Sequence, residues 1–163
     1  MARFIGGFTL ILVILGTSTI LLVQGNQSGK AGQVSYGKEI ITLPGAKSSG
    51  LPFSSAVKCG NTMFLSGVIG TDLKTNELVS QDVGDQTRQC LEKLNSILIQ
   101  GGMNLGDAVN ATVYLTDLND YDAMNKAYAT YFAANPPARA CVQIAKLVKG
   151  AKVEISMIAI KAK

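Results

Sequence analysis

The sequence contains no histidine among its 163 residues, and this absence excludes several kinds of active site. A Ser-His-Asp triad, a Cys-His pair and a histidine-ligated metal site are all ruled out. Only three cysteines are present, Cys59, Cys90 and Cys141, and no two of them have the CxxC spacing of a zinc site. Any catalysis must therefore use arginine, lysine, acidic, tyrosine or hydroxyl side chains, a free thiol or the backbone.

The chain also lacks a cluster of positive charge. Its formal net charge is +4, but the basic residues are scattered and aromatic residues make up only 6% of the chain. The lysines that come closest together, Lys146, Lys149 and Lys152, flank an expected turn. Nucleic-acid binding needs a basic stripe or patch, so no nucleic-acid partner is expected.

The longest uncharged run lies at the N-terminus, where Arg3 precedes residues 4–23. A secretory apolar region is shorter, about 7–15 residues, whereas a membrane span needs about 20. Residues 1–25 are therefore predicted to be a cleaved signal peptide or a retained membrane anchor, with a buried core helix as the less favoured interpretation. Both favoured alternatives place the domain outside the cytoplasm, either exported to a periplasm or medium or tethered to the membrane.

A small, polar stretch at residues 26–37 is typical of a flexible linker, so the folded domain is predicted to span residues 38–163. A first strand is expected at 39–43. Two further strands, at 56–59 and 63–67, flank a hairpin signal. A helix is expected over 82–100, because its apolar residues recur at helical spacing. The residues of this face are Val83, Thr87, Cys90, Leu91, Leu94, Ile97 and Leu98.

The second half begins with alternating residues at 108–115, which predict a strand with Val109, Ala111, Val113 and Leu115 on one side. A second helix is expected from residue 117 to the double proline at 136–137, which ends it. Its aromatic stripe is interpreted as core rather than as a cofactor site. The stripe consists of Tyr121, Met124, Tyr128, Tyr131 and Phe132.

Two terminal strands are expected at 138–146 and 152–160, joined as a hairpin about residues 149–150. The resulting order predicts an α+β fold, in which two helices cover one face of one sheet. The last strand is apolar on both sides, with Ile155 and Met157 on one and Ile158 and Ile160 on the other. Because no chain is left to cover the second face, that face is expected to pack against other copies in a homo-oligomer.

Arg139 and Glu154 are the charged residues on these otherwise apolar terminal strands. In a hairpin they would lie about 13 Å apart, so they could meet only across a subunit boundary or through a substrate. One interpretation is an interfacial ion pair that fixes the assembly. The other is a site in which Arg139 binds a carboxylate as a planar fork and Glu154 deprotonates a water. Cys141 is a candidate nucleophile, but a small buried strand residue is the favoured interpretation.

The segments 137–142, PARACV, and 150–155, GAKVEI, resemble the signature of the RidA (YjgF-type) enamine/imine deaminase family. FLSG at 64–67, QTRQ at 86–89 and VYLTDL at 113–118 also fit, so the resemblance covers residues 38–162. The resemblance implies a chorismate-mutase-like (RidA-type) subunit with a mixed or antiparallel sheet. It also implies a homotrimer around a central β-barrel, with ligand clefts between subunits.

The family hydrolyses reactive 2-imino acids and their enamine tautomers to 2-oxo acids and ammonia. The resemblance therefore implies a deaminase of the 2-iminobutanoate/2-iminopropanoate type that needs no metal or organic cofactor. It assigns the substrate carboxylate to Arg139, and the attacking water with its proton transfers to Glu154. The remaining ligand contacts that it implies are Ser66, Gly67, Asn125 and Cys141.

Phe53 departs from the family pattern, because a tyrosine usually stands at this position in the deaminases. The missing hydroxyl bears on rate or substrate preference, and it leaves open a non-catalytic trimer of the same fold that binds or senses a small acid. Ribonuclease activity and translation inhibition are further roles associated with the family. The turn at Leu147-Val148-Lys149 is a second departure from the common Leu-Pro-Lys of the family. The predicted export is also unusual, because the family mostly works beside its imine sources in cytosol or organelles.

Overall fold

The computed structural model describes residues 37–43 and 51–162. The predicted leader at 1–25 and all but the last residue of the predicted linker at 26–37 lie outside these residues, so both stay predictions. Among the described residues, no helix has the length and apolar character that a membrane span requires. The strands and helices are β1 (Lys38–Ile41), β2 (Ala56–Cys59), β3 (Thr62–Ile69), α1 (Val83–Gln100), β4 (Ala108–Leu115), α2 (Tyr121–Ala129), β5 (Ala138–Gln143) and β6 (Val153–Ile160).

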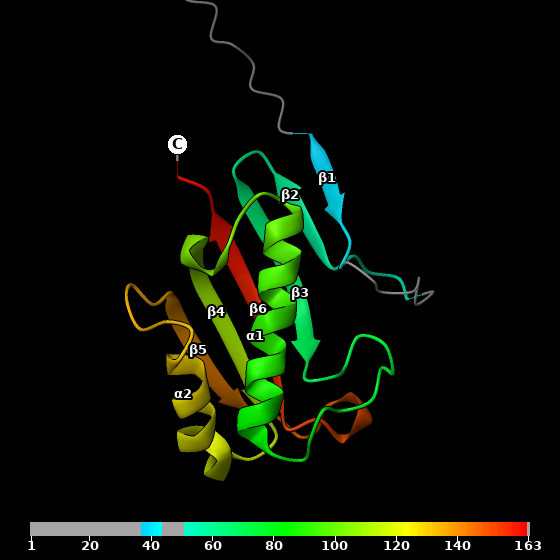
Figure 1. The fold of residues 1–163 in the computed structure, drawn as a ribbon, viewed down its shortest axis with the longest axis vertical. Helices are drawn as coiled ribbons and strands as arrows, with labels where there is room; N and C mark the ends of the chain where they lie inside the picture. The colour runs from blue at the N-terminus through cyan, green and yellow to red at the C-terminus, as the bar shows by residue number, and fades with distance from the viewer. Residues whose placement is uncertain (1–36, 44–50, 163) are drawn as a thin grey trace, which may run out of the picture. The chain divides into compact units, whose positions relative to one another are not determined.

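The six strands form one mixed sheet in the order β1-β2-β3-β6-β4-β5. All neighbouring strands are antiparallel except β4 and β5, which are parallel. Both helices lie against the same face of this sheet (Figure 1). The predicted α+β class, with a mixed sheet and two helices on one face, is therefore confirmed.

Helix α1 matches its prediction closely. The Asp82 side chain caps its N-terminus by accepting a hydrogen bond from the Asp85 amide at 2.9 Å. At its other end, the amide of Gly101 bonds back to helix carbonyls. All seven residues predicted for its apolar face are buried, including Cys90. Cys59 is half-buried at the end of β2.

Helix α2 is shorter than predicted, because it ends at Ala129 rather than at the double proline. The Thr130 hydroxyl donates to the Ala127 carbonyl at 2.7 Å, which competes with continued helical bonding. Tyr131 therefore lies beyond the helix, and Tyr121 is exposed on its first turn. Only the rest of the aromatic stripe is in the core: Met124, Tyr128 and Phe132.

The predicted terminal hairpin is wrong. Strand β4 lies between β5 and β6, pairing in parallel with β5 and antiparallel with β6. Helix α2 carries the chain back across the sheet, so β5 starts at the same end as β4 and occupies the outer edge beside it. The glycine that signalled a hairpin, Gly150, instead lies in a 3-10 turn within the longer connection to β6.

The prediction for β4 is wrong at one residue. Val109 is expected on the same side as Ala111, Val113 and Leu115, but it is exposed. The register against β6 shifts between Ala108 and Asn110. Such a bulge inserts one unpaired residue and reverses the alternation before it. Ala111, Val113 and Leu115 face the helices as predicted.

The second face of the sheet is uncovered by the described residues. Along β6, Val153, Ile155, Met157 and Ala159 are buried, whereas Ile160 is 41% exposed. Phe64, which pairs with Ile158, is 49% exposed. We call the face that carries Phe64, Ile158 and Ile160 the bare face. An apolar face of this kind is consistent with packing between copies.

Candidate functional site

Arg139 lies on β5 and its side chain turns toward α2. The guanidinium donates from Nη2 to Asn125 Oδ1 at 2.5 Å and stacks over the Tyr128 ring, with Cζ 4.6 Å from the ring centroid. Its Nη1 lies 3.9 Å from Met124 Sδ. None of the described carboxylates forms an ion pair with Arg139. Since a guanidinium has five N–H donors, this held side chain keeps donors for an external carboxylate.

A pocket of about 390 Å³ opens beside Arg139. Arg139 and Asn125 supply polar groups, and most of the other walls are apolar. The Tyr128 and Phe132 rings stack with their centroids 4.7 Å apart. Burial raises the pKa of Tyr128 to about 12, so its hydroxyl stays protonated. The lining residues are Asn125, Tyr128, Ala129, Phe132, Pro136, Pro137 and Arg139.

The sequence pattern missed this pocket. It interpreted Tyr128 and Phe132 as core, which their burial confirms. It interpreted Pro136 and Pro137 as the end of a helix that in fact ends at Ala129. The pocket is bordered by the end of α2 at Ala129 and by Phe132, Pro136 and Pro137 of the chain between α2 and β5. No local periodicity signals such an ending.

Glu154 lies on β6 and belongs to the bare face, because its neighbours Val153 and Ile155 are buried on the other. Burial raises the pKa of its carboxyl above the ordinary value of 4.5. The carboxylate lies against the backbone of Gly67, so closely that a Cβ at residue 67 would collide with Oε1. Gly67 itself follows a register shift of β3 against β6, between Leu65 and Val68. A side chain at residue 67 would therefore force the Glu154 carboxylate to move.

Ser66 lies within the same irregular stretch of β3 and is bonded to the loop that follows Phe53. The Ser66 hydroxyl donates to the Ser54 carbonyl at 2.7 Å, and its amide to the Ser55 carbonyl at 3.0 Å. These bonds tie β3 to the loop that follows Phe53, whose own side chain is 63% exposed. Ser66 is therefore beside Gly67 as expected, but its hydroxyl is engaged with the loop backbone.

Cys141 follows Arg139 by two residues on β5 and is half-buried on the same side of the strand. Burial raises the pKa of its thiol, and the nearby Arg139 charge only partly opposes that shift. A nucleophilic cysteine needs the opposite shift. The structure thus favours the interpretation of Cys141 as a packed strand residue.

The sheet separates the two candidate catalytic residues. Arg139 is in register with Ala111 and Met157, which face the helices, whereas Glu154 is in register with Tyr114 and faces away. Arg139 and Glu154 are therefore not spaced along a hairpin, as predicted, but lie on opposite faces of the sheet. One ligand can touch both side chains only if they come from different copies of the chain.

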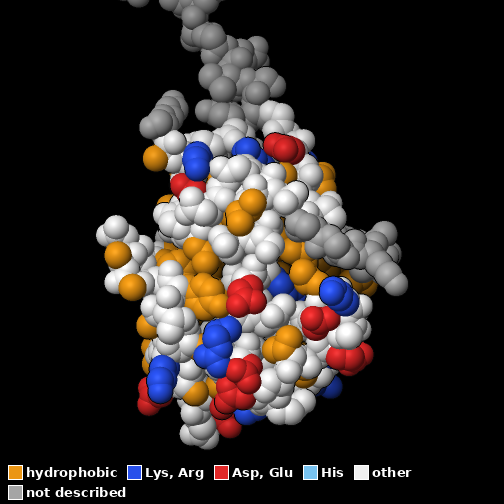
Figure 2. Space-filling model, in the orientation of Figure 1, with side chains coloured by type: hydrophobic (Ala, Val, Ile, Leu, Met, Phe, Trp, Pro, Cys, Tyr) orange, Lys and Arg blue, Asp and Glu red, His pale blue; other side chains and the backbone are white. Residues whose placement is uncertain are grey.

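The charged surface on the helix-bearing side carries acidic and basic side chains together, without a patch of one sign (Figure 2). Within the described part of the chain, no three acidic or cysteine side chains come together as a metal site requires. The fold and the site together define an α+β protein with a held arginine on the helix side of its sheet and a partly buried carboxylate on the bare face.

Comparison with known proteins shows the family to which this α+β chain belongs. The model of the family described as Endoribonuclease L-PSP matches residues 46–161. The chain therefore belongs to this family, the RidA/YjgF family, as its terminal motif predicts.

Named relatives agree with this assignment. The chain is 44% identical over 124 residues to a RutC family protein of Pyrococcus horikoshii, covering 76% of this chain and 98% of that protein. It is 37% identical over 124 residues to the human 2-iminobutanoate/2-iminopropanoate deaminase, covering 76% of this chain and 90% of the human protein. The deaminase family implied by the sequence motifs is thus supported by full-domain similarity.

Solved structures share the fold. The E. coli YjgF gene product superposes with a TM-score of 0.72 at 35% identity, covering 76% of this chain and 99% of that one. E. coli TdcF, whose structure contains bound serine, superposes with a TM-score of 0.71 at 37% identity over the same shares. That protein binds a small molecule that carries a carboxylate.

Proposed function

We propose that this protein hydrolyses reactive 2-imino acids, and their enamine tautomers, to 2-oxo acids and ammonia. The observation that carries the proposal is the Arg139 guanidinium, which Asn125 and Tyr128 hold in place while leaving donors for a carboxylate. The names of relatives add support: besides the human protein, a 41% identical relative in Arabidopsis thaliana is a Reactive Intermediate Deaminase A.

In this proposal Arg139 binds the substrate carboxylate through paired N–H donors and so fixes the imine carbon. Glu154 accepts a proton from a water molecule as the water oxygen bonds to that carbon. Glu154 returns this proton to the imine nitrogen, which gives a carbinolamine. The carbinolamine hydroxyl then passes its proton through Glu154 to the nitrogen, as the carbon–nitrogen bond breaks, the C=O double bond forms and ammonia leaves. Water and imine become ketone and ammonia, so no oxidant or reductant is consumed.

The environment of Glu154 suits this role. Its pKa is raised by burial, which brings the carboxyl closer to neutral pH and makes both proton uptake and release easier. The Gly67 backbone lies directly against it, so that even a Cβ at residue 67 would displace the carboxylate. Within one copy, none of the described ion pairs includes Glu154, so its carboxylate is not engaged by a cation of its own chain.

We further propose that the complete site forms between copies in a homotrimer. Arg139 and Glu154 lie on opposite sides of one sheet, so a neighbouring copy has to supply the second residue. The exposed apolar side chains of the bare face, such as Phe64 and Ile160, are the surface that such an assembly would bury. Light scattering of the purified protein tests the assembly directly.

The test of activity generates 2-iminobutanoate in situ with threonine dehydratase and follows the decay of the imine. The protein is expected to accelerate this decay, and Arg139→Ala to abolish the acceleration. Arg88→Ala is the matched control, since Arg88 is a half-exposed arginine on α1 whose ion pair is with Asp85. No acceleration by a folded, assembled wild-type protein would overturn the proposal.

Phe53 favours a second candidate, a trimer that binds a small acid with little turnover, because the usual hydroxyl is absent. Glu154→Gln separates the two candidates. In a deaminase it removes turnover and keeps binding of 2-oxobutanoate, whereas in a binding protein it changes neither. Ribonuclease activity is not proposed, since the chain has no histidine and the helix-bearing side has no basic patch.

We also propose that the protein is exported or tethered to the membrane, because of the uncharged run at residues 4–23. The deaminase would then act on imines outside the cytoplasm or at the membrane surface. Fractionation of cells expressing the full-length chain tests this, with N-terminal sequencing to show whether a leader is cleaved. Recovery of the uncleaved chain in the cytosol would contradict it.

A further inference from the structure

Helix α1 carries polar side chains on its buried face where it crosses the end of β3. Lys93 is only 8% exposed, and Cys90 is fully buried. None of the described carboxylates is paired with Lys93, and burial lowers its pKa. A buried lysine is costly, so an apolar residue would serve packing better. Its presence therefore needs an explanation from its contacts.

Those contacts are with the backbone at the end of β3. The Cys90 thiol donates to the Val68 carbonyl at 3.2 Å. The Lys93 ammonium donates to the Ile69 carbonyl at 2.9 Å and to the Thr71 hydroxyl at 2.8 Å. Burial raises the pKa of Cys90 to about 12, so the thiol stays protonated and remains a donor. Two neighbouring side chains of α1 thus hold two consecutive carbonyls.

These carbonyls directly follow the irregular stretch that lies under Glu154. The register of β3 shifts between Leu65 and Val68, and Ile69 then pairs with Glu154 itself. Gly67, within the shift, is the residue against which the carboxylate lies. The position of this stretch relative to the sheet therefore sets where the carboxylate can be.

The same helix also holds the other strand of the pair. Buried Gln86 accepts a hydrogen bond at Oε1 from the amide of Lys152, two residues before Glu154, at 2.8 Å. Its Nε2 donates to the Ser80 carbonyl at 2.8 Å. Helix α1 thus fixes both β3 and the start of β6 from the face opposite the carboxylate.

We propose that Lys93 and Cys90 are positioning residues for the deamination, and the proposal rests on the function proposed above. They touch no substrate, because both are buried between α1 and β3 and neither lines the pocket beside Arg139. They fix the β3 stretch around Gly67 and so hold the Glu154 carboxylate where it can accept a proton from water. Lys93 suits this role, since one long side chain reaches a carbonyl and a hydroxyl together.

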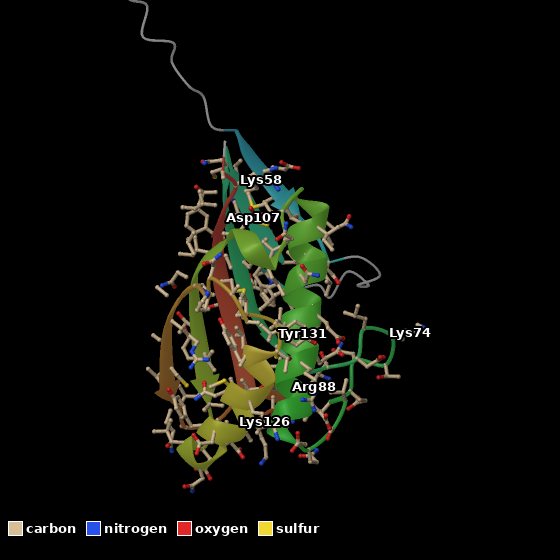
Figure 3. All side chains as sticks on the ribbon, turned by 60° about the vertical axis from the view of Figure 1, so that its left-hand side comes forward. Lys58, Lys74, Arg88, Asp107, Lys126 and Tyr131 are labelled. Carbon is tan, nitrogen blue, oxygen red and sulfur yellow. The ribbon has the colours of Figure 1, made fainter. Side chains whose placement is uncertain are left out.

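The test compares Lys93→Met and Cys90→Ala with Cys90→Ser, which keeps a donor, in the full-length chain. In Lys93→Met the Ile69 carbonyl still accepts a hydrogen bond from the Thr71 amide. The Thr71 hydroxyl, however, loses the hydrogen bond that the Lys93 ammonium donates to it. Lys74→Met is the matched control, because Lys74 lies on an exposed loop that projects away from the sheet (Figure 3). Imine hydrolysis, 2-oxobutanoate binding and the ¹³C titration of the Glu154 carboxyl are measured for each.

Displacing a catalytic group by about 1 Å can cost about 100-fold in rate, so a smaller shift of the stretch should lower kcat by about tenfold. We expect this loss in Lys93→Met and Cys90→Ala, with unchanged affinity for 2-oxobutanoate and substantial recovery in Cys90→Ser. The titration of Glu154 should move toward the ordinary carboxyl value, because a looser stretch admits water. An unchanged kcat in Lys93→Met would overturn the inference, as would an equal loss of kcat and carboxylate affinity.

Failure of the proposed function gives a different result. If the wild-type protein hydrolyses no imine, the Glu154 titration alone decides: a shift in Lys93→Met but not in Lys74→Met supports the positioning role, and no shift overturns it. If Lys93→Met does not fold, the Cys90→Ala and Cys90→Ser pair gives the same two readouts. The Glu154 signal is identified by its loss in Glu154→Gln.

Discussion

Arg139 and Glu154 point to opposite sides of the same sheet, separated by the single strand β4. This geometry makes a specific prediction about mixed assemblies. Arg139→Ala and Glu154→Gln should each be inactive alone, yet they should regain activity when co-expressed. In a ring that takes each residue from a different neighbour, random mixing of equal amounts restores about one quarter of the sites.

The measurement is the imine decay rate of the co-purified mixture, and separately purified variants combined just before the assay serve as the control. Activity that does not recover in the mixed assembly would mean that both residues act within one copy. The sheet would then have to rearrange, because the registers of Arg139 and Glu154 place them on different faces.

Replacing Arg139 by lysine tests the planar fork rather than the charge. Lysine keeps the positive charge but loses paired donation, the stacking over Tyr128 and the bond to Asn125. Hydrogen bonds to charged groups contribute about 1.5–3 kcal/mol, so affinity for 2-oxobutanoate should fall roughly 10- to 100-fold. Isothermal titration measures it, with Arg88→Lys as the control. An affinity equal to that of wild type would exclude Arg139 as the carboxylate ligand.

Gly67→Ala tests the contact under Glu154. A Cβ at this position collides with the carboxylate, which must move away. Turnover should fall by about 100-fold, the cost of roughly 1 Å of misplacement, while binding at Arg139 persists. Gly37→Ala is the control, because nothing lies within 4 Å of a Cβ there. A Gly67→Ala protein with wild-type kcat would show that this glycine does not position the carboxylate.

The sequence pattern is sufficient to predict α1 and β4, because both depend on local periodicity. Strand β4 has its predicted bounds, and α1 differs by one residue at its N-terminus. The sheet order depends on which distant strands meet, and no local pattern encodes that β4 separates β5 from β6. For the site, too, local patterns are sufficient to find residues but not to predict how distant segments arrange them. Their charge on otherwise apolar strands selected Arg139 and Glu154, and motif resemblance gave them roles. Their opposite orientations follow only from the strand order, and the Lys93 contacts only from packing.

Glu154 also predicts a dependence of stability on pH. Its pKa in the folded protein is raised above 4.5, so the folded protein holds this proton more tightly than the unfolded chain does. The cost of burying the ionised carboxylate is therefore absent below the unfolded pKa and is incurred as pH rises through the folded pKa. As pH rises through this range, the free energy of unfolding of Glu154→Gln should increase relative to that of wild type. Urea unfolding at a series of pH values measures this difference. A constant difference between the two proteins across that range would contradict the raised pKa.

Phe53→Tyr restores the hydroxyl that the deaminases of this family usually carry. The Phe53 side chain is 63% exposed, and the loop that follows it is bonded to Ser66 beside Gly67, so an added hydroxyl would be near the candidate site without disturbing the core. One additional hydrogen bond is typically worth about 0.5–1.5 kcal/mol, and if it forms in the transition state the rate should rise about two- to tenfold. Imine decay measures the change, with Tyr121→Phe as a control for a hydroxyl at an exposed site elsewhere. A rise in kcat would make Phe53 a limit on the rate of a working deaminase. An unchanged kcat in an active protein would show that the chemistry at Arg139 and Glu154 does not use that hydroxyl.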